Sequence, residues 1–216
     1  MENIETGSTG RLEAVFQTSF SLIDQIIVGR LGADAIAGVG LSNSFTFIVL
    51  LIYSALGTGS GALIAQAFGR KDMEEVSATA AAGHMAAAFF GTCTAMPLIM
   101  LPEVILRWIG AQGEAASQAA AYFQLFAASA PLNVISAVTT GTFRSLSDTR
   151  TPMIITAGAV ALNTLVGFFF VLGIDPFPRL GVVGVGVSYA VGSNYPVRCF
   201  IDCTLSLNWY GGVFIK

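Results

Sequence analysis

The chain has 216 residues, of which 54% are hydrophobic and only 11% are charged. An ordinary soluble domain carries roughly 25% charged residues, so this composition excludes a typical soluble protein. The net charge of −3 is small and no basic stripe is present, which argues against a nucleic-acid-binding protein.

Long charge-free runs separate short clusters of charged residues. Runs of 35, 27, 29, 24 and 18 residues follow Asp34, Glu75, Glu114, Arg150 and Arg179. A helix needs roughly 20 mostly apolar residues to cross the hydrocarbon core of a bilayer. The clusters therefore predict loops, including one at 103–114, between six helices at 8–29, 35–67, 76–101, 115–142, 152–173 and 181–206. We expect an all-α membrane protein, a six-helix bundle formed as one unit over residues 1–216.

The first predicted helix, 8–29, contains a carboxylate, Asp24, in the otherwise apolar window 20–28. A carboxylate inside a membrane is unfavourable by several kcal/mol unless it takes up a proton or meets a cation. A group that exchanges a proton for a cation is what a coupled transporter needs. The alternative is that Asp24 lies at the helix end and reaches interfacial water.

The second predicted helix contains Gly57, Gly59 and Gly61, which superficially resemble a phosphate-binding loop. The Lys-Ser/Thr pair of such a loop is missing and the segment is apolar, so we reject nucleotide binding. Gly57 and Gly61 instead show the spacing of small residues that lets two helices touch.

No metal site, bound cofactor or enzyme activity is predicted. His84, the one histidine, lies in an Ala-rich helix without a second titratable group at helical spacing. The three cysteines, Cys93, Cys199 and Cys203, are unclustered and fit helix packing. No pairing of a nucleophile with a base emerges.

Three groups of polar residues in or beside the later helices have predicted roles. Asn163, in the middle of the fifth helix, either coordinates a cation or makes an interhelical hydrogen bond. Arg198 and Asp202 lie four apart in the sixth helix, and we expect an interfacial ion pair. Asp148 or Thr149 is predicted to cap the helix at 152–173.

Five segments together resemble the multidrug and toxic compound extrusion (MATE) family of transporters. They are SLIDQIIVGRLG at 21–32, AIAGVG at 35–40, AQAFGRKD at 65–72, DTRTPM at 148–153 and LGVVGVG at 180–186. The resemblance implies one lobe of a two-lobed, twelve-helix fold. It implies export of organic cations, drugs or amphipathic compounds, driven by proton or sodium influx across the plasma (inner) membrane. Asp24 and Asn163 match the family's cation-coupling residues.

Two positions depart from the family pattern, and only half of the fold is present. Gly167 stands where a second polar or acidic residue is common, and Tyr189 stands where a threonine is common. Alternating access needs two bundles, so a second lobe or a second copy must complete the transporter. We expect the chain to be a fragment of a longer protein. Alternatives are a lipid-linked oligosaccharide flippase of a related superfamily, or a half-length membrane subunit that does not transport.

Overall fold

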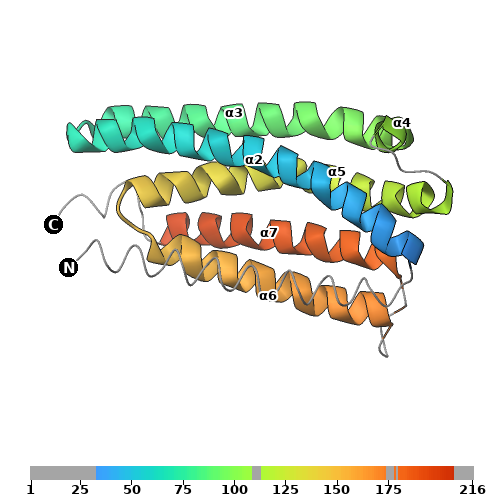
Figure 1. The fold of residues 1–216 in the computed structure, drawn as a ribbon. Helices are drawn as coiled ribbons and strands as arrows, with labels where there is room; N and C mark the ends of the chain where they lie inside the picture. The colour runs from blue at the N-terminus through green and yellow to red at the C-terminus, as the bar shows by residue number, and fades with distance from the viewer. Residues whose placement is uncertain (1–32, 109–112, 174–177, 179, 207–216) are drawn as a thin grey trace.

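The computed structural model describes residues 33–108, 113–173, 178 and 180–206 (Figure 1). Every regular element in these ranges is an α-helix: α2 (Ala33–Gly69), α3 (Met73–Met100), α4 (Pro102–Trp108), α5 (Gly113–Ser145), α6 (Arg150–Leu172) and α7 (Val182–Ser206). The last five predicted ranges overlap α2, α3, α5, α6 and α7, and the predicted helix at 8–29 lies outside the described residues. The expected all-helical bundle is therefore confirmed for the described part of the chain.

Four stretches of these helices are long and apolar enough to cross a membrane. They are Ser42–Gly69, Met73–Met100, Ala120–Ser145 and Arg150–Val171. The outer surface of the bundle is also apolar, with large exposed side chains at Phe47, Ile48, Leu51, Phe89 and Met96. An exposed apolar surface of this kind suits contact with lipid. The sequence of α7 is long enough as well, but polar residues such as Asn194 and Arg198 lower its mean hydropathy.

The short helix α4 occupies part of the segment 103–114, which was predicted as a loop, so that prediction is wrong. Pro102 takes the first helical position, where its fixed φ is favourable and its missing N–H needs no partner. Leu106 is fully buried, and Glu103 and Arg107 form an exposed ion pair at 3.9 Å. In the sequence, charged residues one turn apart on a short exposed helix form the same kind of charge cluster as the residues of a solvated loop.

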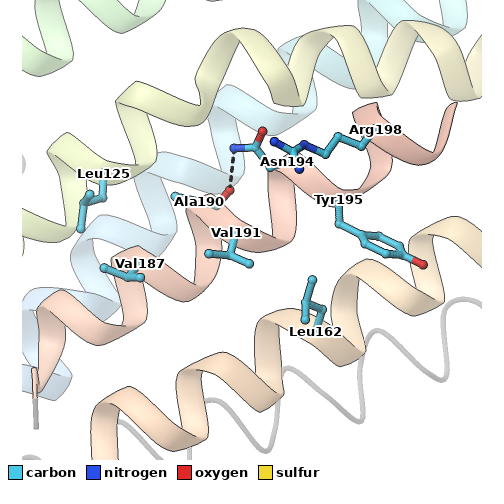
Figure 2. Close-up of a pocket in the computed structure, with 8 residues that line it drawn as sticks. All are labelled: Leu125, Leu162, Val187, Ala190, Val191, Asn194, Tyr195 and Arg198. Atoms are coloured by element: carbon cyan, nitrogen blue, oxygen red, sulfur yellow. Dashed lines mark hydrogen bonds between the residues drawn. The ribbon is translucent and has the colours of Figure 1, made fainter. Parts of the chain in front are cut away.

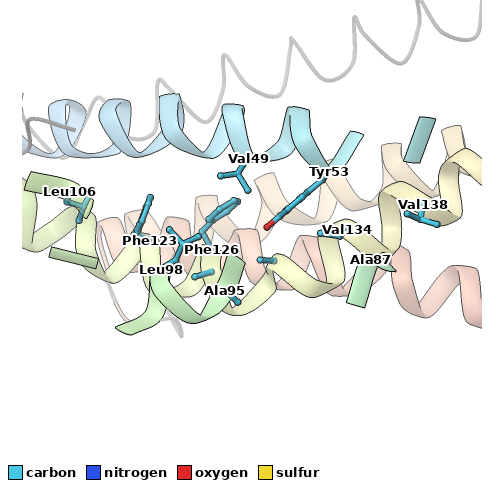
Figure 3. Close-up of a cluster of buried hydrophobic side chains, with 12 residues drawn as sticks. Val49, Tyr53, Ala87, Ala95, Leu98, Leu106, Phe123, Phe126, Val134 and Val138 are labelled. Carbon is cyan, nitrogen blue, oxygen red and sulfur yellow. The ribbon is translucent and has the colours of Figure 1, made fainter. Parts of the chain in front are cut away.

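The helix α5 is the centre of the described bundle. It packs against α2 and α3 on one side and against α7 on the other, while α6 joins mainly through α7 (Figure 1). A buried cluster fixes α5 to its neighbours, as Figure 3 shows. Its members include Phe123, Phe126, Val134 and Val138 of α5, Val49 and Tyr53 of α2, Ala87, Ala95 and Leu98 of α3, and Leu106 of α4.

Small residues let α2 and α5 approach each other closely, as the spacing of Gly57 and Gly61 predicts. A Cβ atom at Gly57 would lie 2.5 Å from the carbonyl oxygen of Ala137, so no side chain fits there. The facing position on α5 is Gly141, and Ser145 donates a hydrogen bond from its Oγ to the Gly61 carbonyl at 2.7 Å. The glycines of this segment therefore serve helix packing.

Carboxylates cap the helices that follow two of the turns. The Asp72 Oδ1 atom accepts a hydrogen bond from the backbone N–H of Glu75 at 3.0 Å. The Asp148 Oδ1 atom accepts from the backbone N–H groups of Arg150 and Thr151, at 3.1 and 3.0 Å. Of the two predicted caps for α6, Asp148 is therefore the one whose side chain acts, since Thr149 makes no side-chain capping bond.

Candidate functional site

Of the two residues predicted to couple transport to a cation, Asn163 lies in the described part of the structure and Asp24 does not. Asp24 lies outside the described residues, so its surroundings stay a prediction. Asn163 lies midway along α6, and its side chain is half-buried.

Asn163 packs against a glycine of the neighbouring helix. A Cβ atom at Gly192 of α7 would lie 2.9 Å from the Asn163 Cβ and 3.2 Å from its Nδ2. The Asn163 side chain makes no hydrogen bond with any residue of the described ranges, so the interhelical bond considered above is not formed there. Its amide is therefore available to another partner.

The next residue of α6 also has a polar atom without a partner. The Oγ1 atom of Thr164 is buried and makes no hydrogen bond within the described structure, and only 8% of this residue is exposed. A buried hydroxyl without a partner is unfavourable by roughly 1–3 kcal/mol. The middle of α6 thus presents two adjacent polar side chains, Asn163 and Thr164, that the described helices leave unsatisfied.

The two departures from the family pattern have structural roles of their own. A Cβ atom at Gly167 would lie 3.2 Å from the Oγ of Ser188, so the glycine allows α6 and α7 to pack closely. The ring of Tyr189 lies 5.3 Å from that of Phe126, centroid to centroid, which joins α7 to α5. Gly167 therefore brings no polar side chain to this part of α6.

A pocket of about 450 Å³ opens between α5, α6 and α7 (Figure 2). It is lined by Leu125, Leu162, Val187, Ala190, Val191, Asn194, Tyr195 and Arg198. Six of these residues belong to α7 and recur at helical spacing, which places them on one face of that helix. The sequence alone does not predict this pocket, although Val187, Val191, Asn194 and Arg198 recur at the spacing of one helix face.

Arg198 is not in the ion pair that the sequence predicted. No ion pair joins Arg198 to Asp202, and neither residue pairs with another charge in the described structure. Figure 2 shows the guanidinium running back along α7 toward Asn194. An arginine four residues before an aspartate is also the less favourable order for a helical ion pair.

His84 has two hydrogen-bond partners. Its Nδ1 lies 2.7 Å from the carbonyl oxygen of Ala80, and its Nε2 lies 2.9 Å from the Oγ1 of Thr139 on α5. This histidine therefore links α3 to α5. Among the described residues, no three His, Cys, Asp or Glu side chains gather in a way that could hold a metal ion.

The MatE family model matches residues 11–169 of the chain. The "Probable multidrug resistance protein NorM" of Thermotoga maritima is 30% identical over 177 residues, which is 82% of this chain and 38% of that protein. The "FAD transporter" of Shewanella oneidensis is 30% identical over 175 residues, which is 78% of this chain and 37% of that protein. The chain thus spans less than half the length of these curated relatives.

Solved structures show the same likeness in three dimensions. An outward-facing multidrug resistance MATE family transporter of the MOP superfamily is similar with a TM-score of 0.82 and 25% identity, over 94% of this chain and 44% of that one. A MATE structure in the straight conformation gives a TM-score of 0.88 at 22% identity, over 100% of this chain and 47% of that one. The second match is evidence for the fold alone.

Proposed function

Because the chain belongs to the MatE family, a family of membrane transporters, we propose that it forms one lobe of a secondary active antiporter. The exported compounds are organic cations, drugs or amphipathic metabolites, and the driving force is the influx of protons or sodium ions across the plasma membrane. The observation that carries this proposal is the family match over residues 11–169, in a chain whose described residues fold as a helical bundle with four candidate membrane spans.

Asp24 is the proposed coupling carboxylate. In the membrane its charged form needs a cation, so protonation and cation binding exclude each other at this group. The half-buried amide of Asn163 and the hydroxyl of Thr164, which bonds to no described residue, support a polar region in the middle of α6. We propose that Asn163 adds its amide oxygen to the coupling site.

A second lobe, or a second copy of this one, is a necessary partner in this proposal. Alternating access arises when two bundles rock about a site at their interface, and one bundle alone cannot expose that site to both sides in turn. The half-length match to the solved transporters supports this requirement, since the chain covers 44% of the outward-facing structure.

The test is transport by the purified full-length protein in liposomes with an imposed proton or sodium gradient. We expect gradient-driven movement of an organic cation such as ethidium, and we expect Asp24→Asn to abolish it while membrane insertion is retained. The matched control is Asp202→Asn, which removes an exposed carboxylate that pairs with no described residue. Undiminished transport by a well-folded Asp24→Asn protein would remove the coupling mechanism. No transport by the wild type under either gradient would instead favour a non-transporting subunit.

A further inference from the structure

We propose that the pocket between α5, α6 and α7 binds an amphipathic molecule with an anionic head group, which Arg198 contacts. The site differs from the proposed coupling site, because Asn163 packs against Gly192 and does not line the pocket. The inference concerns binding and does not depend on antiport.

The walls of the pocket suit an apolar body. Leu125, Leu162, Val187 and Val191 contribute branched apolar side chains from three helices. The volume of about 450 Å³ lies within the range of roughly 300–1,000 Å³ that is usual for small-molecule sites. Because its α7 residues recur along one helix face, the pocket is elongated along α7 and fits an acyl or alkyl chain.

The polar end of the pocket suits an anion. The Arg198 guanidinium has five N–H donors in a planar fork, and this fork matches a carboxylate or phosphate. None of the described residues that line the pocket is acidic, and Arg198 forms no ion pair with any of the described residues. An anionic ligand would therefore pair with a charge that the described residues leave without a counter-ion.

Asn194, one helical turn before Arg198, offers further polar contacts. The Asn194 Nδ2 donates to the Ala190 carbonyl oxygen at 3.4 Å, a long hydrogen bond that leaves the second N–H and the amide oxygen free for a ligand. The Tyr195 ring packs against Gly158 of α6, which joins α6 to α7 beside the pocket. A neutral or cationic head group would meet the guanidinium without neutralising it, so the site discriminates by charge.

The test uses photolabelling of the full-length protein in phosphatidylcholine vesicles. The probe is a twelve-carbon alkyl phosphate that carries a diazirine, and its counterpart carries a trimethylammonium head group. We expect the phosphate probe to label the α7 residues that line the pocket, and we expect Arg198→Gln to reduce this labelling about tenfold or more. Arg107→Gln, which removes an exposed charge from α4, is the control and should label as the wild type does.

If Arg198→Gln fails to fold, competition between the probe and unlabelled compounds on the wild-type protein tests the proposal instead. Excess dodecyl phosphate should prevent the labelling and excess dodecyltrimethylammonium should not. Equal competition by the two compounds, or labelling that Arg198→Gln leaves unchanged in a folded protein, would overturn the proposal.

Phosphatidylglycerol added to the vesicles distinguishes the two sources of such a ligand, a membrane lipid and a single-chain amphipath. If it displaces the probe, the ligand is a membrane lipid, and if only dodecyl phosphate does, the ligand is a single-chain amphipath.

Discussion

Gly57 of α2 and Gly141 of α5 meet backbone to backbone, so closely that a Cβ atom on either residue would overlap the carbonyl of the facing helix. The overlap is with main-chain atoms, which cannot move aside as a flexible side chain can. We therefore expect Gly57→Val to separate α2 from α5 and to lower the free energy of unfolding by about 3 kcal/mol, the upper end of the usual range for an overpacked core. Reversible unfolding in detergent measures the change.

The matched control for this prediction lies two residues along the same helix. Gly59 is exposed, and a Cβ atom there would have no neighbour within 4 Å. Gly59→Val should leave the unfolding free energy within about 0.5 kcal/mol of the wild type, as is usual for surface substitutions. Equal losses in Gly57→Val and Gly59→Val would show that valine itself, and not the helix contact, causes the effect.

The hydrogen bond between His84 and Thr139 should contribute to the packing of α3 on α5. We expect a double-mutant cycle of His84→Ala and Thr139→Ala to give a coupling free energy of about 1 kcal/mol, a usual value for a hydrogen bond between membrane helices. The control cycle pairs His84→Ala with Thr92→Ala, since the Thr92 hydroxyl bonds only to the Ala88 carbonyl of its own helix. Coupling of the same size in both cycles would mean that the effect is not specific to this contact.

Asn163→Ala should reduce transport while changing the free energy of unfolding very little. The Asn163 side chain makes no hydrogen bond with the described residues, so its removal should change the unfolding free energy by less than about 1 kcal/mol. Gradient-driven transport in liposomes should fall severalfold, because the proposed coupling site loses an amide. Asn133→Ala is the comparison, since the Asn133 amide is held by the Ser129 carbonyl of its own helix at 3.0 Å. Transport by Asn163→Ala that equals that of Asn133→Ala would count against a role in coupling.

The Asp148 side chain should stabilise the start of α6 by capping its first backbone N–H groups. Asp148→Ala removes the acceptor of two backbone N–H groups, and loss of such a cap lowers the free energy of unfolding by about 1 kcal/mol. Asp148→Asn keeps an oxygen acceptor and should retain most of the stability. Thermal unfolding in detergent distinguishes the two variants. Equal losses for the asparagine and the alanine would show that the charge, and not the oxygen acceptor of the cap, stabilises the turn.

The helices were predictable because charge is excluded from the bilayer core and is concentrated at its edges. The charge clusters at 70–75 and 144–150 mark the ends of α2, α3, α5 and α6 to within a few residues. The same rule failed at α4, where Glu103 and Arg107 face water from a helix whose Leu106 is buried. A charge pattern reports exposure to water, and it does not distinguish a loop from a short helix at the surface.

The contacts between helices were predictable only in part. The spacing of Gly57 and Gly61 indicates that some helix approaches α2, but it does not name Gly141, because the partner depends on how the bundle folds. The ion pair of Arg198 with Asp202 was expected from spacing alone, and the structure directs Arg198 the other way, toward Asn194. The pocket could not be derived from α7 by itself, since α5 and α6 supply two of its walls.

The central place of α5 sets an order for assembly during synthesis. The helices α2 and α3 emerge from the ribosome before α5. The surfaces against which Gly57 and Gly91 pack, however, are formed by Ala137 and Pro131 of α5. These two helices can enter the membrane early, but their glycine faces have nothing to dock on until α5 follows. A chain arrested after Met100 would therefore leave the glycine faces of α2 and α3 without the helix against which they pack, and α5 completes this packing when it follows.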